Sequence, residues 1–188
     1  FWDFFNKCLI QSVKLIKANK PIVSKVYIPK FILILVKIGV NGFKMFISLL
    51  IIVAMLAVWR VPITYNVIYI IPILMTLIVL VFGFSCYLLH YGVFVEDLSN
   101  VLNIALRFLF YLTGIFWSIM DRLPAPYNSY IGRCNPIAFL LTSARDCVIY
   151  GSTPHRKLLL LWFVIGLIIS ALGVRKIYKN ENSYVKVI

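Results

Sequence analysis

The most constraining feature of the sequence is a stretch without any charged residue, which runs from Val61 to Val95. A helix of that length would be about 50 Å long at a rise of 1.5 Å per residue. A bilayer core is about 30 Å thick, so the stretch is too long for one span and too short for two. We therefore predict one helix over 66–91 and a short loop at Val61-Pro62. Pro72, near the helix start, is tolerated there or produces a kink.

The composition excludes a soluble globular domain. Hydrophobic residues make up 62% of the chain and charged residues 13%, whereas a soluble domain carries about 25% charged residues. The 19 Lys and Arg against 6 Asp and Glu give a net charge of +13. A nucleic-acid partner would require a solvated basic surface, for which most of this chain has no room. We therefore predict an all-α, polytopic helical membrane protein that does not bind nucleic acid.

Three further segments are long and apolar enough to cross a bilayer, and they cover 31–59, 98–120 and 158–174. Thr153-Pro154 predicts an N-cap and a first-turn proline for the last of them. Its Gly166-x-x-x-Ser170 spacing is typical of closely packed membrane helices.

The ends of the chain predict its orientation. Residues 1–18 place charged residues at helical spacing, which indicates either an amphipathic interfacial helix or the inner end of another span. The stretch 14–30 and the tail 175–188 are both basic. The positive-inside rule therefore places both in the cytoplasm, and an even number of intervening spans agrees with that.

Two predicted spans carry a polar stripe on one helical face. The stripes are Lys37, Asn41, Lys44 and Ser48 on the first, and Glu96, Asn100, Asn103 and Arg107 on the second. Charges at such depth cost several kcal/mol unless they face a polar cavity or a partner. We interpret the stripes as the lining of a hydrated path through the protein. The alternatives are that Lys37 snorkels to the interface and that Lys44 or Arg107 pairs with a carboxylate.

The segment 121–157 is too apolar for a solvated loop. Asn135-Pro136 predicts an N-cap with a first-turn proline, followed by a helix over 137–150 that stops at Gly151. We expect this helix to dip back into the outer leaflet, with Arg145-Asp146 as a local polar anchor.

The sequence offers no sign of a catalytic or metal site. The four cysteines lack metal-ligand spacing and are interpreted as packing residues, although a disulfide between Cys134 and Cys147 stays open. His90 is likewise interpreted as a packing residue.

Several motifs, in their order and spacing, resemble one family of membrane proteins. They are Trp2-x-Phe4-Phe5, the segment 19–30, Arg107 to Trp117, Leu123-Pro124, and Asn135-Pro136 followed by Arg145. Together they resemble the membrane subunits of type-2 ATP-binding-cassette exporters of polysaccharides, teichoic acids and O-antigens over nearly the whole chain. Three positions depart from the family pattern: Glu96 replaces an Arg, Gly114 replaces a Pro, and Lys30-Phe31 after Pro29 replaces Arg-Glu.

The resemblance implies one transmembrane domain that lacks the family's first span and amphipathic gate helix. The implied segments are the inner part of span 2 (1–18), a cytoplasmic coupling loop (19–30), span 3 (31–59), span 4 (66–91), span 5 (98–120), an outer loop with re-entrant helices (121–157), span 6 (158–174) and a cytoplasmic tail (175–188).

The resemblance also implies a function in the bacterial cytoplasmic membrane. A homodimer with two copies of a separate ATPase would export an undecaprenyl-pyrophosphate-linked polysaccharide of the teichoic acid or O-antigen and capsule type. ATP and Mg would bind to the ATPase, and this chain, surrounded by membrane lipids, would hold no cofactor and catalyse nothing. The implied ATPase-coupling residues are Asn19, Lys20, Ile22, Val23, Ser24, Lys25, Val26 and Tyr27.

The implied substrate path combines cations for the pyrophosphate with rings for the sugars. Its residues are Lys37, Asn41, Lys44, Asn103, Arg107, Phe110, Tyr111, Phe116 and Trp117. Two other functions stay open: a type-2 permease for a drug or small lipid, and a lipid-modifying membrane enzyme. The second lacks the convergent carboxylates that such enzymes use.

Overall fold

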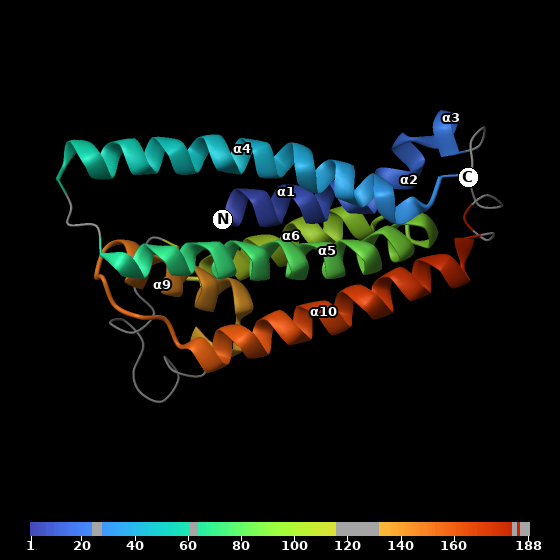
Figure 1. The fold of residues 1–188 in the computed structure, drawn as a ribbon. Coiled ribbons are helices and arrows are strands. Elements are labelled where there is room, and N and C mark those ends of the chain that lie inside the picture. Colours follow the sequence, from blue (N-terminus) through green and yellow to red (C-terminus); the bar gives the residue numbers. More distant parts are fainter. Residues whose placement is uncertain (24–27, 61–63, 116–131, 182–183, 185–188) are drawn as a thin grey trace.

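The computed structural model describes residues 1–23, 28–60, 64–115, 132–181 and 184. In these ranges every regular element is a helix, so the predicted all-α fold class is confirmed. The helices run roughly side by side as an elongated bundle (Figure 1). They are α1 (Trp2–Val13), α2 (Leu15–Ala18), α3 (Lys20–Val23), α4 (Lys30–Val58), the 3-10 helix η1 (Tyr65–Tyr69), α5 (Ile70–Phe94), α6 (Leu98–Leu112), α9 (Pro136–Val148) and α10 (Arg156–Lys179).

Three helical stretches of the described chain are long and apolar enough to cross a membrane: α4, η1 with α5, and α10. Their outward faces carry large apolar side chains, among them Phe43, Ile51 and Leu160, which are more than 40% exposed. In a bilayer these side chains contact lipid tails, so the free-energy cost of exposing apolar surface to water does not arise.

The helix predicted over 98–120 is shorter than expected. α6 ends at Leu112, and Gly114 follows it in the left-handed region with φ of 63°. Glycine adopts that conformation without steric cost, so it readily ends a helix. Hydropathy alone does not detect this turn, because the residues on both sides of it are apolar.

α5 is the central helix, and its buried residues form much of the core, including Ile73, Leu77, Leu80 and Leu89.

Small residues on α10 allow this helix to pack closely against α5. Gly166 and Gly173 of α10 lie against Leu80 and Cys86, and the Ser170 hydroxyl donates to the Val79 carbonyl over 3.0 Å. The small-residue spacing on α10 therefore has the packing role expected for it.

The N-terminal helix α1 lies alongside α4 and α5 within the bundle (Figure 1). Phe4, Phe5 and Leu9 on one face are buried, and Asp3 pairs with Lys7 over 2.8 Å on the exposed side. α1 is therefore packed into the bundle through its apolar face, and its assignment to the inner part of a span stays a prediction.

α9 lies at the opposite end of the bundle from α2 and α3 (Figure 1). Its predicted N-cap is confirmed, because the Asn135 Oδ1 accepts from the backbone N–H groups of Ile137 and Ala138 over 3.1 and 3.3 Å. The Arg145 guanidinium donates to the Ile115 carbonyl over 3.0 Å. Arg145 therefore anchors α9 to the end of α6.

Two other details of this region differ from expectation. α10 begins at Arg156 with His155 as N-cap, so the predicted cap at Thr153-Pro154 is wrong. The reason is that the N–H groups of Leu158 and Leu159 bond to the His155 carbonyl, which fixes the start of the helix there. Cys134 and Cys147 are free, and no disulfide joins them.

Candidate functional site

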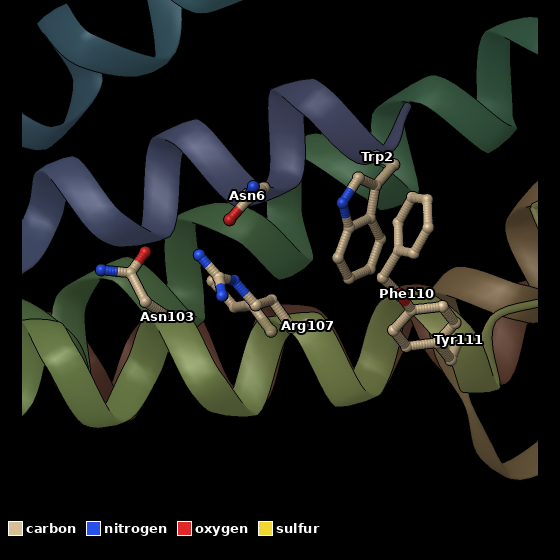
Figure 2. Close-up of a pocket in the computed structure, with 7 residues that line it drawn as sticks. Trp2, Asn6, Asn103, Arg107, Phe110 and Tyr111 are labelled. Atoms are coloured by element: carbon tan, nitrogen blue, oxygen red, sulfur yellow. The ribbon is translucent and has the colours of Figure 1, made fainter.

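A polar hollow of about 500 Å³ lies between α1 and α6 (Figure 2). Three polar side chains and three aromatic rings occur among its lining residues, which are Trp2, Asn6, Asn103, Leu106, Arg107, Phe110 and Tyr111. We refer to it as the α1–α6 pocket. It contains four residues of the predicted substrate path, namely Asn103, Arg107, Phe110 and Tyr111.

Helical periodicity places these side chains in the α1–α6 pocket. Trp2 and Asn6 are four residues apart on α1, and Asn103 and Arg107 are four apart on α6, so each pair lies on one helical face. Figure 2 shows Asn6 and Arg107 extending toward each other from the two helices. The pocket therefore has a polar section made by both helices.

The other section of the α1–α6 pocket is aromatic. The Trp2 and Phe110 rings meet edge to face with centroids 5.5 Å apart, and Phe110 meets Tyr111 in the same way at 5.6 Å. Edge-to-face pairs of this kind hold rings in fixed orientations. Tyr111 is 72% exposed, so its ring is accessible at the rim.

Arg107 supplies the positive charge of the pocket. It is exposed and forms no salt bridge within the described ranges, where the salt bridges are Asp3–Lys7 and Lys30–Glu181. The alternative that Arg107 is neutralised by a carboxylate thus finds no partner in this part of the chain. A guanidinium of this kind can bind a phosphate through two parallel hydrogen bonds.

The first polar stripe lies in a different place. Asn41 and Lys44 border a smaller hollow of about 90 Å³ between α1 and α4, together with Asp3 and Lys7. Asn41 is buried, and its amide donates to Gln11 Oε1 over 3.0 Å, whereas Lys44 is exposed. Lys37 is half-buried and does not line either hollow.

The two stripes border different hollows in the described part of the chain. α1 contacts both α4 and α6, and each hollow lies against α1. A sequence stripe gives the face of a helix but not the neighbour of that face. The structure thus places the two stripes at separate hollows of one chain, and the path that they would line together stays a prediction.

The coupling residues are only partly described. Asn19 lies between α2 and α3 and donates to the Leu15 carbonyl over 2.8 Å, and α3 contains Lys20, Ile22 and the buried Val23. Ser24, Lys25, Val26 and Tyr27 lie outside the described residues, and so do Phe116 and Trp117 of the predicted substrate path.

Sequence reasoning missed a polar cluster at the end of the bundle that holds α2 and α3. Lys30, expected in a loop, is the first residue of α4 and forms a buried salt bridge of 2.9 Å with Glu181. Tyr184, which belongs to the predicted cytoplasmic tail over 175–188, is fully buried, and its hydroxyl lies 2.8 Å from His90 Nδ1. Burial raises the pKa of Tyr184 to about 12, with the Glu181 carboxylate acting in the same direction. Its phenol is therefore neutral at physiological pH.

The sequence contains a signal for some of the residues that were not predicted, but not for others. Trp2 and Asn6 could have been found, because their spacing of four marks a common helical face. The pairing of Lys30 with Glu181 could not have been predicted, because 151 positions separate the two residues and no local sequence pattern connects them.

These features define an all-helical, multi-pass membrane protein with a cationic, aromatic pocket beside its spans. The chain is similar over its entire length to two Klebsiella pneumoniae proteins, each described as "O-antigen export system permease protein RfbA". The identities are 23% and 22%, and each match covers 100% of this chain and 71% of the relative. No family model matches the chain. The predicted resemblance to polysaccharide-export permeases is confirmed, and the chain is a multi-pass protein of the inner membrane.

Proposed function

We propose that this chain is the permease subunit of an ATP-driven exporter for an undecaprenyl-pyrophosphate-linked polysaccharide. The observation that carries the proposal is the α1–α6 pocket, in a chain similar throughout to O-antigen export permeases. The names of these relatives favour an O-antigen type of glycan over a teichoic acid. They also support a transporter subunit over a catalytic enzyme.

The two sections of the α1–α6 pocket match the two parts of such a substrate. Arg107 would bind the pyrophosphate through charge-assisted hydrogen bonds, which are strong where water is scarce. Trp2, Phe110 and Tyr111 would stack on the apolar faces of sugar rings. Asn6 and Asn103 would bond to sugar hydroxyls, and the Asn6 carbonyl oxygen has no hydrogen-bond partner in the described structure.

Lys44 would serve as a second cationic position on the other side of α1. It forms no salt bridge within the described ranges, and the nearby Asp3 carboxylate is paired with Lys7. An ammonium at this depth is stabilised by a hydrated hollow and destabilised by bare lipid. We expect it to attract the same pyrophosphate group during entry.

The energy would come from a separate ATPase that binds ATP and Mg and docks on residues 19–27. Residues 15–18 and 20–23 form the short helices α2 and α3 at one end of the bundle. This part of the chain is basic, and we expect it to lie in the cytoplasm. Two permease chains and two ATPase chains would form the complex, with the substrate passing between the permeases.

Arg107→Gln tests the role of the pocket in a complex reconstituted with its ATPase. Undecaprenyl-pyrophosphate-linked glycan should stimulate wild-type ATP hydrolysis, and the variant should lose this stimulation while it still assembles with the ATPase. Arg175→Gln, an exposed arginine on α10 outside the pocket, is the matched control and should respond like the wild type.

The probes separate the competing functions. Undecaprenyl pyrophosphate alone, free glycan, a phospholipid and a cationic dye are each tested against the lipid-linked glycan. Stimulation by phospholipid or dye alone would identify a lipid or drug permease. Equal stimulation of wild type and Arg107→Gln by the lipid-linked glycan would contradict the assigned site.

A further inference from the structure

Three separate parts of the chain meet at the end of the bundle that holds α2 and α3. They are the first residue of α4 (Lys30), the last turns of α5 (His90 to Phe94), and the tail beyond α10 (Glu181 and Tyr184). Figure 1 shows the last turns of α10 at the same end of the bundle as α2 and α3. Nothing in the proposed transport site requires this convergence.

The Lys30–Glu181 salt bridge holds the tail to α4. Its 2.9 Å separation joins side chains that are only 3% and 10% exposed. A buried pair differs from a surface pair, because removing one partner leaves an uncompensated charge out of water. The two residues therefore keep the start of α4 and the tail together far more firmly than an exposed pair would.

Tyr184 holds the tail to α5. Its hydroxyl lies 2.8 Å from His90 Nδ1, and its ring packs against the rings of His90 and Phe94 with centroids 5.9 and 6.2 Å apart. α10 is attached to the same turns, since the Lys176 ammonium donates to the Tyr91 hydroxyl over 2.7 Å and lies 4.2 Å from that ring. The tail thus bridges α4, α5 and α10.

The backbone before Lys30 explains why such a bridge matters. Pro29 is extended, with φ of −56° and ψ of 121°, so α3 and α4 are not one continuous helix. A push on residues 19–27 would be absorbed by rotation at Pro29 if the start of α4 were free to tilt alone. Fixing Lys30 to the tail removes that freedom.

We propose that Glu181 and Tyr184 are positioning residues for transport, which tie α4 to the cytoplasmic ends of α5 and α10 so that all three spans follow the ATPase stroke. This inference rests on the proposed function, because it takes residues 19–27 as the ATPase contact. The tail is therefore a mechanical part of the permease. It is not a solvated extension.

A spin-label distance measurement tests this connection of α4 with α5 and α10, which we call the tie, and it requires no glycan. Labels on Val36→Cys in α4 and Lys179→Cys in α10, both exposed positions, report whether these two helices move together in the complex with its ATPase. The background is Cys134→Ser, since Cys134 is the exposed native cysteine in the described chain. On trapping with ATP and vanadate, the distance should stay constant in this background and change after Glu181→Gln.

Glycan export per ATP hydrolysed provides the second measurement. Glu181→Gln should lower this ratio by about fivefold or more while ATP hydrolysis continues, and the reversed pair Lys30→Glu with Glu181→Lys should restore most of it. A merely structural salt bridge would change the yield of complex but not this ratio. Tyr184→Phe keeps the ring and removes the hydroxyl, so it should give a smaller fall in the same direction.

The outcomes separate the inference from the proposed function. An unchanged label distance and an unchanged export ratio in an assembled Glu181→Gln complex would overturn the tie. If Glu181→Gln does not assemble, Tyr184→Phe decides, and an unaltered ratio in that variant also overturns it. Failure of the wild-type complex to export any lipid-linked glycan would refute the proposed substrate, whereas the vanadate-dependent distances would still test the tie.

Discussion

The contact between α5 and α10 gives a quantitative prediction at Gly83. A Cβ at this position would lie 2.9 Å from Ile169 Cγ2, 3.0 Å from Ser170 Oγ and 3.1 Å from the Ser170 backbone nitrogen. Side-chain rotation cannot relieve the last of these contacts, so α10 would have to move away by a few tenths of an ångström. Overpacking of this kind costs about 1–3 kcal/mol.

Gly39→Ala is the matched control for Gly83→Ala. Gly39 also lies within a candidate span, on α4, and nothing surrounds its Cβ position within 4 Å. Both variants gain the same helix propensity of Ala over Gly, about 1 kcal/mol, so this effect cancels when they are compared. The difference between them measures the contact with α10 alone.

Unfolding of the purified protein in mild detergent, followed by circular dichroism on titration with a denaturing detergent, measures this difference. We expect Gly83→Ala to be less stable than Gly39→Ala by about 1–3 kcal/mol. Equal midpoints for the two variants would show that α5 and α10 do not approach as closely as the structure indicates. A displacement of α10 should also weaken the Ser170 to Val79 hydrogen bond of 3.0 Å.

Three further predictions concern the polar stripe, the topology and the ATPase contact. Lys44→Gln should abolish substrate-stimulated ATPase activity while expression and dimer assembly are retained; loss of folding would instead identify Lys44 as a structural residue, and no effect would place it outside the path. Thr142→Cys, on α9 at the end of the bundle away from α2 and α3, should react with impermeant thiol reagents from outside only. Ser24→Asp combined with Tyr27→Asp should uncouple ATP hydrolysis from export in a folded permease, and normal export at an unchanged ATPase rate would contradict the docking assignment.

The parts of the fold that follow local rules could be predicted from the sequence. Hydropathy located α4, α5 and α10 because a span must be apolar along its whole length. The Asn135 cap was predictable because the side chain and the N–H groups that it binds are two and three residues apart. The end of α6 could not be predicted in this way, because Gly114 lies among apolar residues that are equally compatible with a continued helix.

For the candidate site, the sequence predicts which residues share a face of one helix, but not which helices pack together. Asn103 and Arg107 were assigned to a common face by their spacing, but the spacing does not tell which helix covers that face. The structure places α1 there and puts Asn41 and Lys44 in a separate hollow. The bridge between Lys30 and Glu181 depends on how the complete chain folds, because residues at opposite ends of it supply the two charges.

Export of lipid-linked glycan into inverted membrane vesicles or proteoliposomes tests whether this permease is part of an ATP-driven glycan exporter. The permease is reconstituted with its ATPase, supplied with ATP and Mg outside, and presented with an undecaprenyl-pyrophosphate-linked O-antigen glycan in the outer leaflet. We expect ATP-dependent protection of the glycan from an external glycosidase, and loss of that protection in Arg107→Gln but not in Arg175→Gln. Glycan that stays fully accessible to the glycosidase in an assembled, ATP-hydrolysing wild-type complex would contradict the proposed export function.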